Sequence, residues 1–199
     1  MALGIIIAGG QSQRFNKNSF SHQDKYLASF GETTLLGHII DRAKIQCDDL
    51  ILNVNGDQNR VLGYGLDVIS DDYIDVGPLG GILAALSAAR DKGHRHIITF
   101  SSDSPYFPDD YLDRLMAAVN RDDNKVAVAS SGGRCHPVMG AFSVTCQDNL
   151  KKYIESGERR VMPWVKQQAH EEVIWEPAEP DPFFNINSAE DLAEAEKYL

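Results

Sequence analysis

The residues with the clearest chemical potential lie near the start of the chain, where a short apolar run leads into paired glycines. Leu3–Ile7 is apolar and rich in β-branched residues, and Ala8, Gly9 and Gly10 follow it. This is the pattern of a buried strand that ends in a tight loop. Glycines let the backbone approach a ligand closely, and its N–H groups can then bind an anion. Such a loop could hold the phosphates of a ligand, although an ordinary turn has the same pattern.

Two basic side chains follow the glycines in a protein that is acidic overall. Arg14 and Lys25 stand downstream of the loop, while the whole chain has 29 Asp and Glu against 19 Lys and Arg. Fixed cations stabilise the charge that develops on phosphate oxygens during phosphoryl and nucleotidyl transfer. Arg14 and Lys25 are therefore candidate catalytic residues, with an ordinary surface lysine as the alternative for Lys25. The chain lacks the Walker and dinucleotide-binding glycine motifs, which excludes those two kinds of phosphate loop.

Two acidic residues follow other strand-like runs. Asp103 comes after His96–Phe100, and a carboxylate there could bind Mg²⁺, a hard ion that prefers oxygen ligands. Asp71 comes after Leu66–Ile69 and could be a second metal ligand or accept hydrogen bonds from a ribose or a base. The alternatives are a turn residue before Pro105 for Asp103 and a solvated acidic loop for Asp71.

The elements that must position these residues alternate between strands and helices. The predicted strands are Leu3–Ile7, Leu50–Val54, Leu66–Ile69, His96–Phe100, Val126–Ala129, Pro137–Ser143 and Val173–Trp175. The predicted helices are Thr34–Ile45, Gly80–Arg90, Asp109–Asn120, Gln147–Ser156, Val161–Gln168 and Ser188–Leu199. This alternation predicts an α/β fold with a mostly parallel sheet covered on both faces. Because ligands of such folds bind at the carboxyl ends of the strands, Gly9, Asn53, Asp71 and Asp103 should converge on one rim.

Length and composition limit the class of protein. The 199 residues, of which 43% are hydrophobic, fit a single domain over residues 1–199 with a full-sized core. The net charge of −10 argues against non-specific nucleic-acid binding. Cys47, Cys135 and Cys146 are widely spaced, which predicts neither a zinc site nor a disulfide framework and fits a reducing cytoplasm. Because the sequence shows no signal peptide and no apolar run near the roughly 20 residues that span a bilayer, we expect a cytoplasmic protein without a membrane partner.

Six segments taken together resemble nucleotidyltransferases that activate a small phosphate or alcohol with a nucleoside triphosphate. The segments shared most widely are the strand with Ala-Gly-Gly, Arg14 and Asp24-Lys25, then Gly77–Gly81, then Asp103–Pro105. The segments that resemble the molybdenum cofactor guanylyltransferases in particular are Arg134–Pro137, Gly157–Met162 and Phe183–Leu192. The chain departs from that family's pattern in its glycine loop, where Phe15 replaces the usual Met and Asn16–Gln23 resembles an insertion.

The resemblance implies a fold, a reaction and a set of site residues. The fold would be a Rossmann-like three-layer sandwich, similar to nucleotide-diphospho-sugar transferases. The reaction would transfer GMP from GTP to the terminal phosphate of molybdopterin and release pyrophosphate. Carried over by position, the residues that would contact GTP are Ile7, Ala8, Gly9, Gly10, Lys25, Asn53, Asp71 and Asp103. Asp103 would also hold Mg²⁺. The residues that would line the molybdopterin side are Arg134, His136, Arg159, Arg160, Asn185 and Asn187. The partners would be GTP, molybdopterin and proteins that insert or carry the cofactor.

Several alternatives remain open at this point. A relative of the same fold could use CTP or activate a different alcohol phosphate. A non-catalytic protein could bind the nucleotide and deliver the cofactor. A sugar-phosphate nucleotidyltransferase would explain the first loop, but not Gly157–Met162 or the ending with Asn185 and Asn187. These two asparagines could also simply shape a turn.

Overall fold

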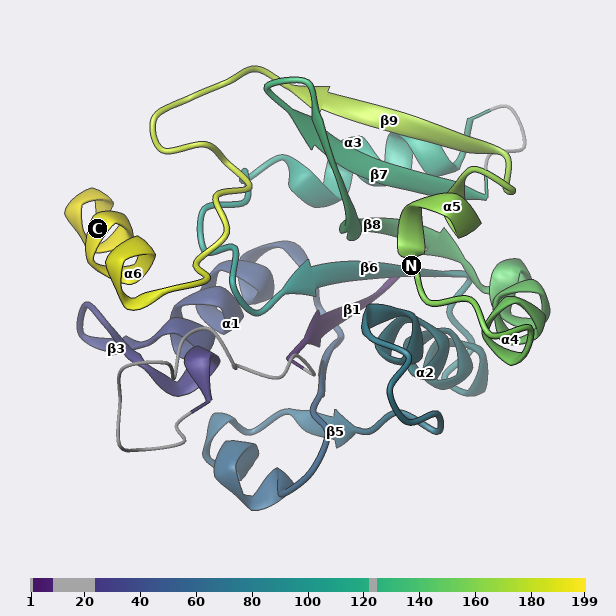
Figure 1. Ribbon diagram of the computed structural model, residues 1–199, viewed down its shortest axis with the longest axis horizontal. Helices are drawn as coiled ribbons and strands as arrows, with labels where there is room; N and C mark the ends of the chain where they lie inside the picture. Colours follow the sequence, from purple (N-terminus) through teal and green to yellow (C-terminus); the bar gives the residue numbers. More distant parts are fainter. Residues whose placement is uncertain (1, 9–23, 122–124) are drawn as a thin grey trace.

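The structure, a computed structural model, describes residues 2–8, 24–121 and 125–199, and its centre is a seven-stranded sheet (Figure 1). Four sequence predictions therefore lie outside the described residues, namely Gly9, Gly10, Arg14 and the insertion at Asn16–Gln23. Among the described residues, no helix is both long and apolar enough to span a membrane.

The sheet is mostly parallel, as predicted. In their order across the sheet, the strands are β5 (Asp67–Ile69), β4 (Leu50–Asn53), β1 (Ala2–Ile7), β6 (His96–Ser101), β8 (Arg134–Ser143), β7 (Val126–Ser131) and β9 (His170–Trp175). The first four are parallel to one another, and β9 is parallel to β7. Strand β8 is antiparallel to both β6 and β7. A separate short ladder pairs β2 (Ser29–Phe30) with β3 (Thr33–Thr34).

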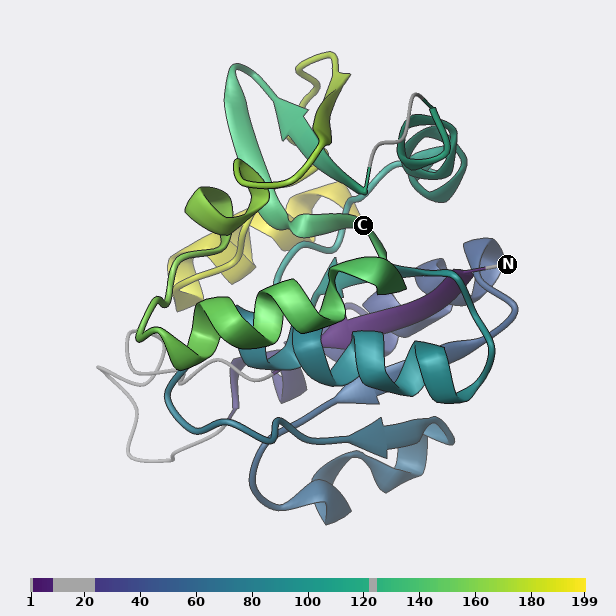
Figure 2. The ribbon, with the colours of Figure 1, turned by 90° about the vertical axis from the view of Figure 1, so that its right-hand side faces the viewer.

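Helices cover both faces of this sheet and complete a three-layer sandwich (Figures 1 and 2). One side of the core contains residues of α1 (Leu35–Gln46), α3 (Tyr111–Val119) and α6 (Ala189–Ala195). The other side contains residues of α2 (Pro78–Asp91), α4 (Gln147–Glu155) and α5 (Val161–Val165). The short 3-10 helices are η2 (Lys25–Leu27), η3 (Gln58–Tyr64), η4 (Val144–Cys146) and η5 (Glu196–Tyr198).

The position of strand β1 explains why polar residues do not alternate with apolar ones in the first apolar run. Leu3, Ile5 and Ile7 belong to the core on the α2 side, whereas Ile6 belongs to the core on the α1 side. Successive side chains of a strand point to opposite faces, so a strand covered on both faces must be apolar throughout. The continuous run Leu3–Ile7 is thus the direct consequence of helices on both sides of β1.

Two predicted helix starts are confirmed by their caps. The side chain of Thr34 accepts a hydrogen bond from the N–H of Gly37 and begins α1. Ser188 and Asp191 form a capping box at α6, in which each side chain accepts from the backbone of the other residue. These bonds satisfy N–H groups that the first turn of a helix leaves without partners.

Four predicted boundaries are wrong by three or four residues, among them the start of β9, which is His170 rather than Val173. Strand β8 begins at Arg134 rather than Pro137, because Gly132 and Gly133 have φ of 53° and 76° and make a tight turn back from β7. Helix α5 ends at Val165 rather than Gln168, since the following residues turn toward β9 through hydrogen bonds of the i to i−3 type. The last helix ends at Ala195, and η5 continues it.

Candidate active site

The carboxyl ends of four parallel strands meet at one edge of the sheet, as predicted. Ile7 at the end of β1 stands beside Asn53 of β4 and Ser101 of β6, and Asn53 stands beside Ile69 of β5. Asp71 and Asp103 follow β5 and β6 by two residues. The parallel register therefore brings polar groups from separate parts of the chain to one rim.

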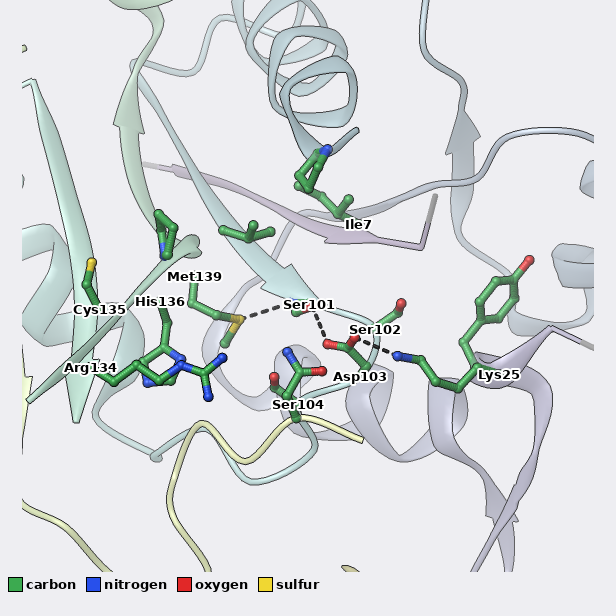
Figure 3. A pocket seen from close by; sticks show the side chains of 15 residues that line it. Ile7, Lys25, Ser101, Ser102, Asp103, Ser104, Arg134, Cys135, His136 and Met139 are labelled. Carbon is green, nitrogen blue, oxygen red and sulfur yellow. Dashed lines mark hydrogen bonds and ion pairs between the residues drawn. The ribbon is translucent and has the colours of Figure 1, made fainter. Parts of the chain in front are cut away.

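Asp103 forms the charged centre of this rim (Figure 3). The ammonium of Lys25, at the start of η2, lies 2.7 Å from Oδ2 of Asp103. The hydroxyl of Ser101 donates to Oδ1 at 2.6 Å. The two charged side chains are only 15% and 18% exposed, so water screens their attraction less than that of a surface pair. The predicted candidates Lys25 and Asp103 are thus in direct contact across the sheet edge.

Asn185 also lies against Asp103, although it is far away in the sequence. With its nitrogen turned toward the carboxylate, the side-chain amide donates to Oδ2 at 2.7 Å and to Oδ1 at 2.9 Å. The backbone N–H of Ile186 donates to the carbonyl of Asp103 at 2.8 Å and holds the segment in place. A half turn of the amide would bring its oxygen to the carboxylate, which is favourable only with a cation between the two groups. The Asp103 carboxylate thus accepts from Lys25, Ser101 and Asn185.

A cavity of about 320 Å³, here called the Asp103 cavity, opens beside this pair. Its lining includes predicted residues from both proposed substrate groups, namely Ile7, Lys25, Asp103, Arg134, His136 and Asn185. A bulge in β8 shapes its wall: Val128 pairs with Gly140 and the next residue, Ala129, pairs with His136. The residues in between, Pro137–Met139, leave the ladder and line the cavity. Bulges suit proline, which has no N–H to give to a ladder.

The surroundings of His136 favour its neutral form in this cavity. Burial lowers the pKa of His136, the neighbouring Arg134 lowers it further, and Asp181 opposes both. The ring packs on Phe183 with a centroid distance of 4.9 Å. An anion that entered the cavity would counter the effect of Arg134 and favour the protonated imidazole.

A second, larger cleft of about 840 Å³, here called the Asp71 cleft, adjoins the first. Tyr26 lines both of them, and Ala8 and Asp71 line the cleft. The carboxylate of Asp71 accepts hydrogen bonds from the side-chain amides of Asn53 at 2.8 Å and Asn55 at 2.9 Å. Asn53 is fully buried, and its Oδ1 has no hydrogen-bond partner among the described residues. This network holds the Asp71 carboxylate in a defined orientation at the cleft wall.

Two glycines of α2 leave room for this network. A Cβ atom on Gly80 would lie 2.5 Å from Oδ2 of Asp71, and one on Gly81 would lie 2.6 Å from Oδ1 of Asn53. Both distances are too short for non-bonded atoms. The Gly77–Gly81 segment therefore needs glycine here for close packing of the helix start on the polar network.

The other predicted residues of the molybdopterin side lie at different distances from the Asp103 cavity. Arg159 and Arg160 line a neighbouring open cavity of about 550 Å³ that shares Pro78 and Pro137 with the Asp103 cavity. Asn187 is exposed at the start of α6, where its N–H donates to Asp191 and its amide donates to the carbonyl of Asn185. The structure does not bring Asn187 into any of these cavities.

Sequence reasoning missed three residues of the site. Tyr26 links the two cavities, Ser101 orients Asp103, and Asn55 orients Asp71. Asn55 and Ser101 stand near the ends of predicted strands, which is the signal that could have found them. Tyr26 carries no such signal beyond its position next to Lys25.

Comparison with known proteins agrees with this arrangement. Residues 4–173 match the model of a family described as MobA-like NTP transferase domain. A protein of Bradyrhizobium sp. (strain ORS 278) named molybdenum cofactor guanylyltransferase is 39% identical over 198 residues, which cover 98% of this chain and 91% of that protein. A protein of Haemophilus influenzae (strain ATCC 51907 / DSM 11121 / KW20 / Rd) with the same name is 34% identical over 94% of each chain.

A solved structure shows the same fold. The molybdopterin-guanine dinucleotide biosynthesis protein A of Archaeoglobus fulgidus superimposes with a TM-score of 0.74 over 98% of this chain and 97% of that one, at 18% identity. The predicted three-layer fold of the nucleotide-diphospho-sugar transferase type is therefore confirmed. From its full-length similarity to the named relatives, the chain belongs to the MobA-like nucleotidyltransferases and, among them, to the molybdenum cofactor guanylyltransferase family.

Proposed function

We propose that this protein transfers GMP from GTP to the terminal phosphate of molybdopterin and releases pyrophosphate. The observation that carries the proposal is the Lys25–Asp103 pair in the Asp103 cavity, next to the adjoining Asp71 cleft. A carboxylate and an ammonium at this place suit a reaction in which phosphate charge must be neutralised on two reactants. Membership of the guanylyltransferase family supports the choice of substrates.

The Asp71 cleft is the proposed site for the nucleoside of GTP. Its volume of about 840 Å³ is within the range of small-molecule sites. The Asp71 carboxylate accepts hydrogen bonds only, so it suits the N–H groups on the edge of a guanine or the hydroxyls of a ribose. Ile7 and Ala8 would lie beside the nucleotide, because Ala8 lines this cleft and Ile7 lines the adjoining one.

The Asp103 cavity is the proposed site for the acceptor phosphate. Arg134 and His136 line it, and the cavity of Arg159 and Arg160 adjoins it across Pro137. Guanidinium groups bind phosphate through two parallel hydrogen bonds. These basic side chains would hold the phosphate of molybdopterin and leave its pterin in the adjoining open cavity.

The residues at Asp103 fit a magnesium ion. Mg²⁺ in nucleotide sites is held by one or two carboxylates together with substrate phosphates and water. Asp103 would hold the ion, and a half turn of the Asn185 amide, whose nitrogen now faces the carboxylate, would add an amide oxygen as a second ligand. When bound, Mg²⁺ would neutralise charge on the triphosphate.

In the proposed transfer step, the side chains of the protein position the two substrates and neutralise phosphate charge. An oxygen of the acceptor phosphate forms a bond to the α-phosphorus of GTP, and the bond from that phosphorus to the pyrophosphate oxygen breaks. The acceptor is already an anion near neutral pH, so no strong base is required. Lys25 would leave Asp103 to contact the phosphates of GTP, and positioning with charge neutralisation would supply most of the rate. Arg14, outside the described residues, is proposed to assist in holding the pyrophosphate.

Cysteine chemistry supports a cytoplasmic location as part of this proposal. Cys47 and Cys146 are buried, and burial raises the pKa of their thiols to about 12 and about 11. These thiols are therefore unreactive. The argument for the location is that Cys47, Cys135 and Cys146 are all free, as is usual in a reducing compartment. Proteins that insert the cofactor into its target enzymes would then receive the product there.

The experiment that tests the reaction measures pyrophosphate release with Mg²⁺, molybdopterin and each of GTP, CTP, ATP and UTP in turn. We expect release with GTP alone, because a site that hydrogen-bonds the base disfavours a base with mismatched exocyclic groups, which leaves the polar groups of the site unpaired. Release with CTP instead would retain the nucleotidyl transfer and overturn the choice of base. Binding of GTP without release by any nucleotide would identify a carrier and contradict the proposed reaction.

Replacing Gly80 with alanine tests the assignment of the Asp71 cleft. The new Cβ atom would push the Asp71 carboxylate from its place, so we expect the Kd for GTP to rise about tenfold, as for loss of a hydrogen bond to a charged group. Isothermal titration calorimetry measures this value. Gly63→Ala is the matched control, because a Cβ atom there meets nothing within 4 Å. An unchanged Kd for Gly80→Ala would remove Asp71 from the nucleotide site.

A further inference from the structure

The ring of His136 is fixed from two sides by residues that the proposed reaction does not use. Its Nε2 lies 3.1 Å from the hydroxyl of Ser131, which stands on the neighbouring strand β7. The ring of Phe183 packs on it at 4.9 Å and an angle of 33° between the ring planes. A histidine that lines a cavity therefore has one nitrogen committed to a buried partner.

Ser131 also forms a hydrogen bond with a carboxylate. Its Oγ lies 2.9 Å and 3.0 Å from the two oxygens of Asp181, and Ser131 is 2% exposed. A hydroxyl has one proton, and an ionised carboxylate can only accept. The Ser131 hydroxyl must therefore donate to Asp181, and its oxygen is left to accept from the Nε2–H of His136.

This direction of donation determines the tautomer of the neutral ring. When Nε2 carries the proton, Nδ1 holds the lone pair, and Nδ1 takes part in no hydrogen bond among the described residues. The ring can then gain a second proton only at Nδ1. His136 would thus present an acceptor in its neutral form and a donor in its protonated form.

Asp181 is itself held rigidly by its own loop. The N–H of Phe183 donates to Oδ1 of Asp181 at 2.8 Å, and the N–H of Phe184 donates to its carbonyl at 2.9 Å. The same loop presents Phe183 to the ring of His136 and leads directly to Asn185 on Asp103. One loop thereby orients groups on both sides of the Asp103 cavity.

We propose that Ser131 and Asp181 are positioning residues that hold His136 as its Nε2–H tautomer and stabilise its protonated form when an acceptor phosphate enters the Asp103 cavity. The inference rests on the proposed function for the identity of that phosphate. The negative charge of Asp181 acts through the polarised Ser131 hydroxyl, as in other buried hydrogen-bond networks.

The charges around His136 agree with a ring that gains its proton on binding. Arg134 on β8 opposes protonation and Asp181 favours it, while burial has the largest effect and lowers the pKa. Lys25 and Asp103 line the same cavity and are paired with each other. An incoming phosphate dianion adds negative charge beside His136 that is not already paired, as the charge of Asp103 is with Lys25.

The hydrogen-bonded chain from Asp181 through Ser131 to His136 is here called the relay. Nitrogen-15 NMR of the histidine rings tests it without any turnover. With His136→Asn used for assignment, we expect the wild-type ring to show the Nε2–H tautomer and to gain a proton at higher pH when inorganic phosphate is added. Ser131→Ala should give a mixture of tautomers. Asp181→Asn keeps a hydrogen-bond acceptor but removes the charge, so it should lower the pH at which the ring protonates. An unchanged ring signal in both variants would overturn the relay.

A double-mutant cycle separates the relay from a merely structural role of the loop. We expect Asp181→Asn to raise the KM for molybdopterin about tenfold with a smaller change in kcat, as for the loss of an interaction with a charged group. In the His136→Asn background the same substitution should change KM less than about twofold, because coupled residues are not additive. An equal factor in both backgrounds would show that Asp181 acts through the fold alone and would contradict the proposal.

The results of these two experiments distinguish failure of the relay from failure of the proposed function. If the wild-type protein transfers no GMP but the NMR coupling of Asp181 to His136 is present, the relay stands and the proposed reaction falls. If the wild-type protein turns over normally and neither variant alters the ring, the reaction stands and the relay falls.

Discussion

Replacing Asp103 with alanine is expected to lower kcat by about a hundred- to a thousandfold, the usual cost of removing one preorganised electrostatic contact in an active site. The carboxylate receives the ammonium of Lys25, the hydroxyl of Ser101 and the amide of Asn185. Removal would leave these groups facing an uncharged methyl group. The proposed binding of Mg²⁺ and the neutralisation of the triphosphate would be lost together.

The fold should survive this change. The carbonyl of Asp103, which accepts from the N–H of Ile186, is unaffected by a side-chain substitution. Circular dichroism and thermal unfolding, together with pyrophosphate release at saturating Mg²⁺, check both parts of the prediction. Asp103→Asn refines the test, since it keeps the shape of the side chain and removes only the charge. We expect it to be nearly as inactive as Asp103→Ala.

A matched control exists on the surface. Asp109 has a side chain that is 93% exposed and pairs with Arg42, and neither residue lines the three cavities described above. Asp109→Ala should leave kcat within about twofold of wild type, because exposed ion pairs contribute little. Near-normal turnover of a folded Asp103→Ala variant would remove Asp103 from the proposed metal site.

Replacing Lys25 with alanine is the second change with a large expected effect. The ammonium lies in the Asp103 cavity, 2.7 Å from Asp103, and the next residue, Tyr26, lines both this cavity and the Asp71 cleft proposed for the nucleoside. We expect kcat/KM for GTP to fall about a hundredfold or more, while the order of preference among the four nucleotides stays the same. The physical reason is that an ammonium binds phosphate charge and does not contact the base.

The nucleotide panel is the measurement that checks this prediction. Lys151→Ala is a suitable control, because Lys151 is an exposed lysine of α4. The double variant of Lys25 and Asp103 should lose less than the product of the two single losses, since residues in contact are coupled. A change in the preferred nucleotide would argue against the phosphate role of Lys25.

Hydrophobic periodicity predicted the strands of the main sheet and the six α-helices that cover it, but not the β2–β3 ladder or the 3-10 helices. All seven strands of the sheet were predicted, and the clearest signal came from strands that are buried on both faces and leave a continuous apolar run such as Leu3–Ile7. The predicted boundaries were wrong at the start of β8, the end of α5, the start of β9 and the end of α6. In β8, the glycine pair at 132 and 133 turns the chain earlier than the apolar pattern indicates.

The rim of polar residues at strand ends was also predictable. It follows from the general rule that parallel strands deliver their carboxyl ends to one edge, and Asn53, Asp71 and Asp103 obey it. The sequence could not predict that Asn185 would lie on Asp103 rather than only on the acceptor side. That contact depends on how the loop before α6 crosses the edge of the sheet.

By itself, the sequence determined the α/β class, the family and the kinds of chemical groups at the site, because these follow from local patterns and from short motifs. Only the tertiary structure decided which groups meet. Lys25 reaches Asp103 across 78 positions of the chain, and Asp181 reaches Ser131 across 50. Such pairings depend on strand order, the bulge in β8 and the path of one loop. These are properties of packing, and no local pattern of residues encodes them.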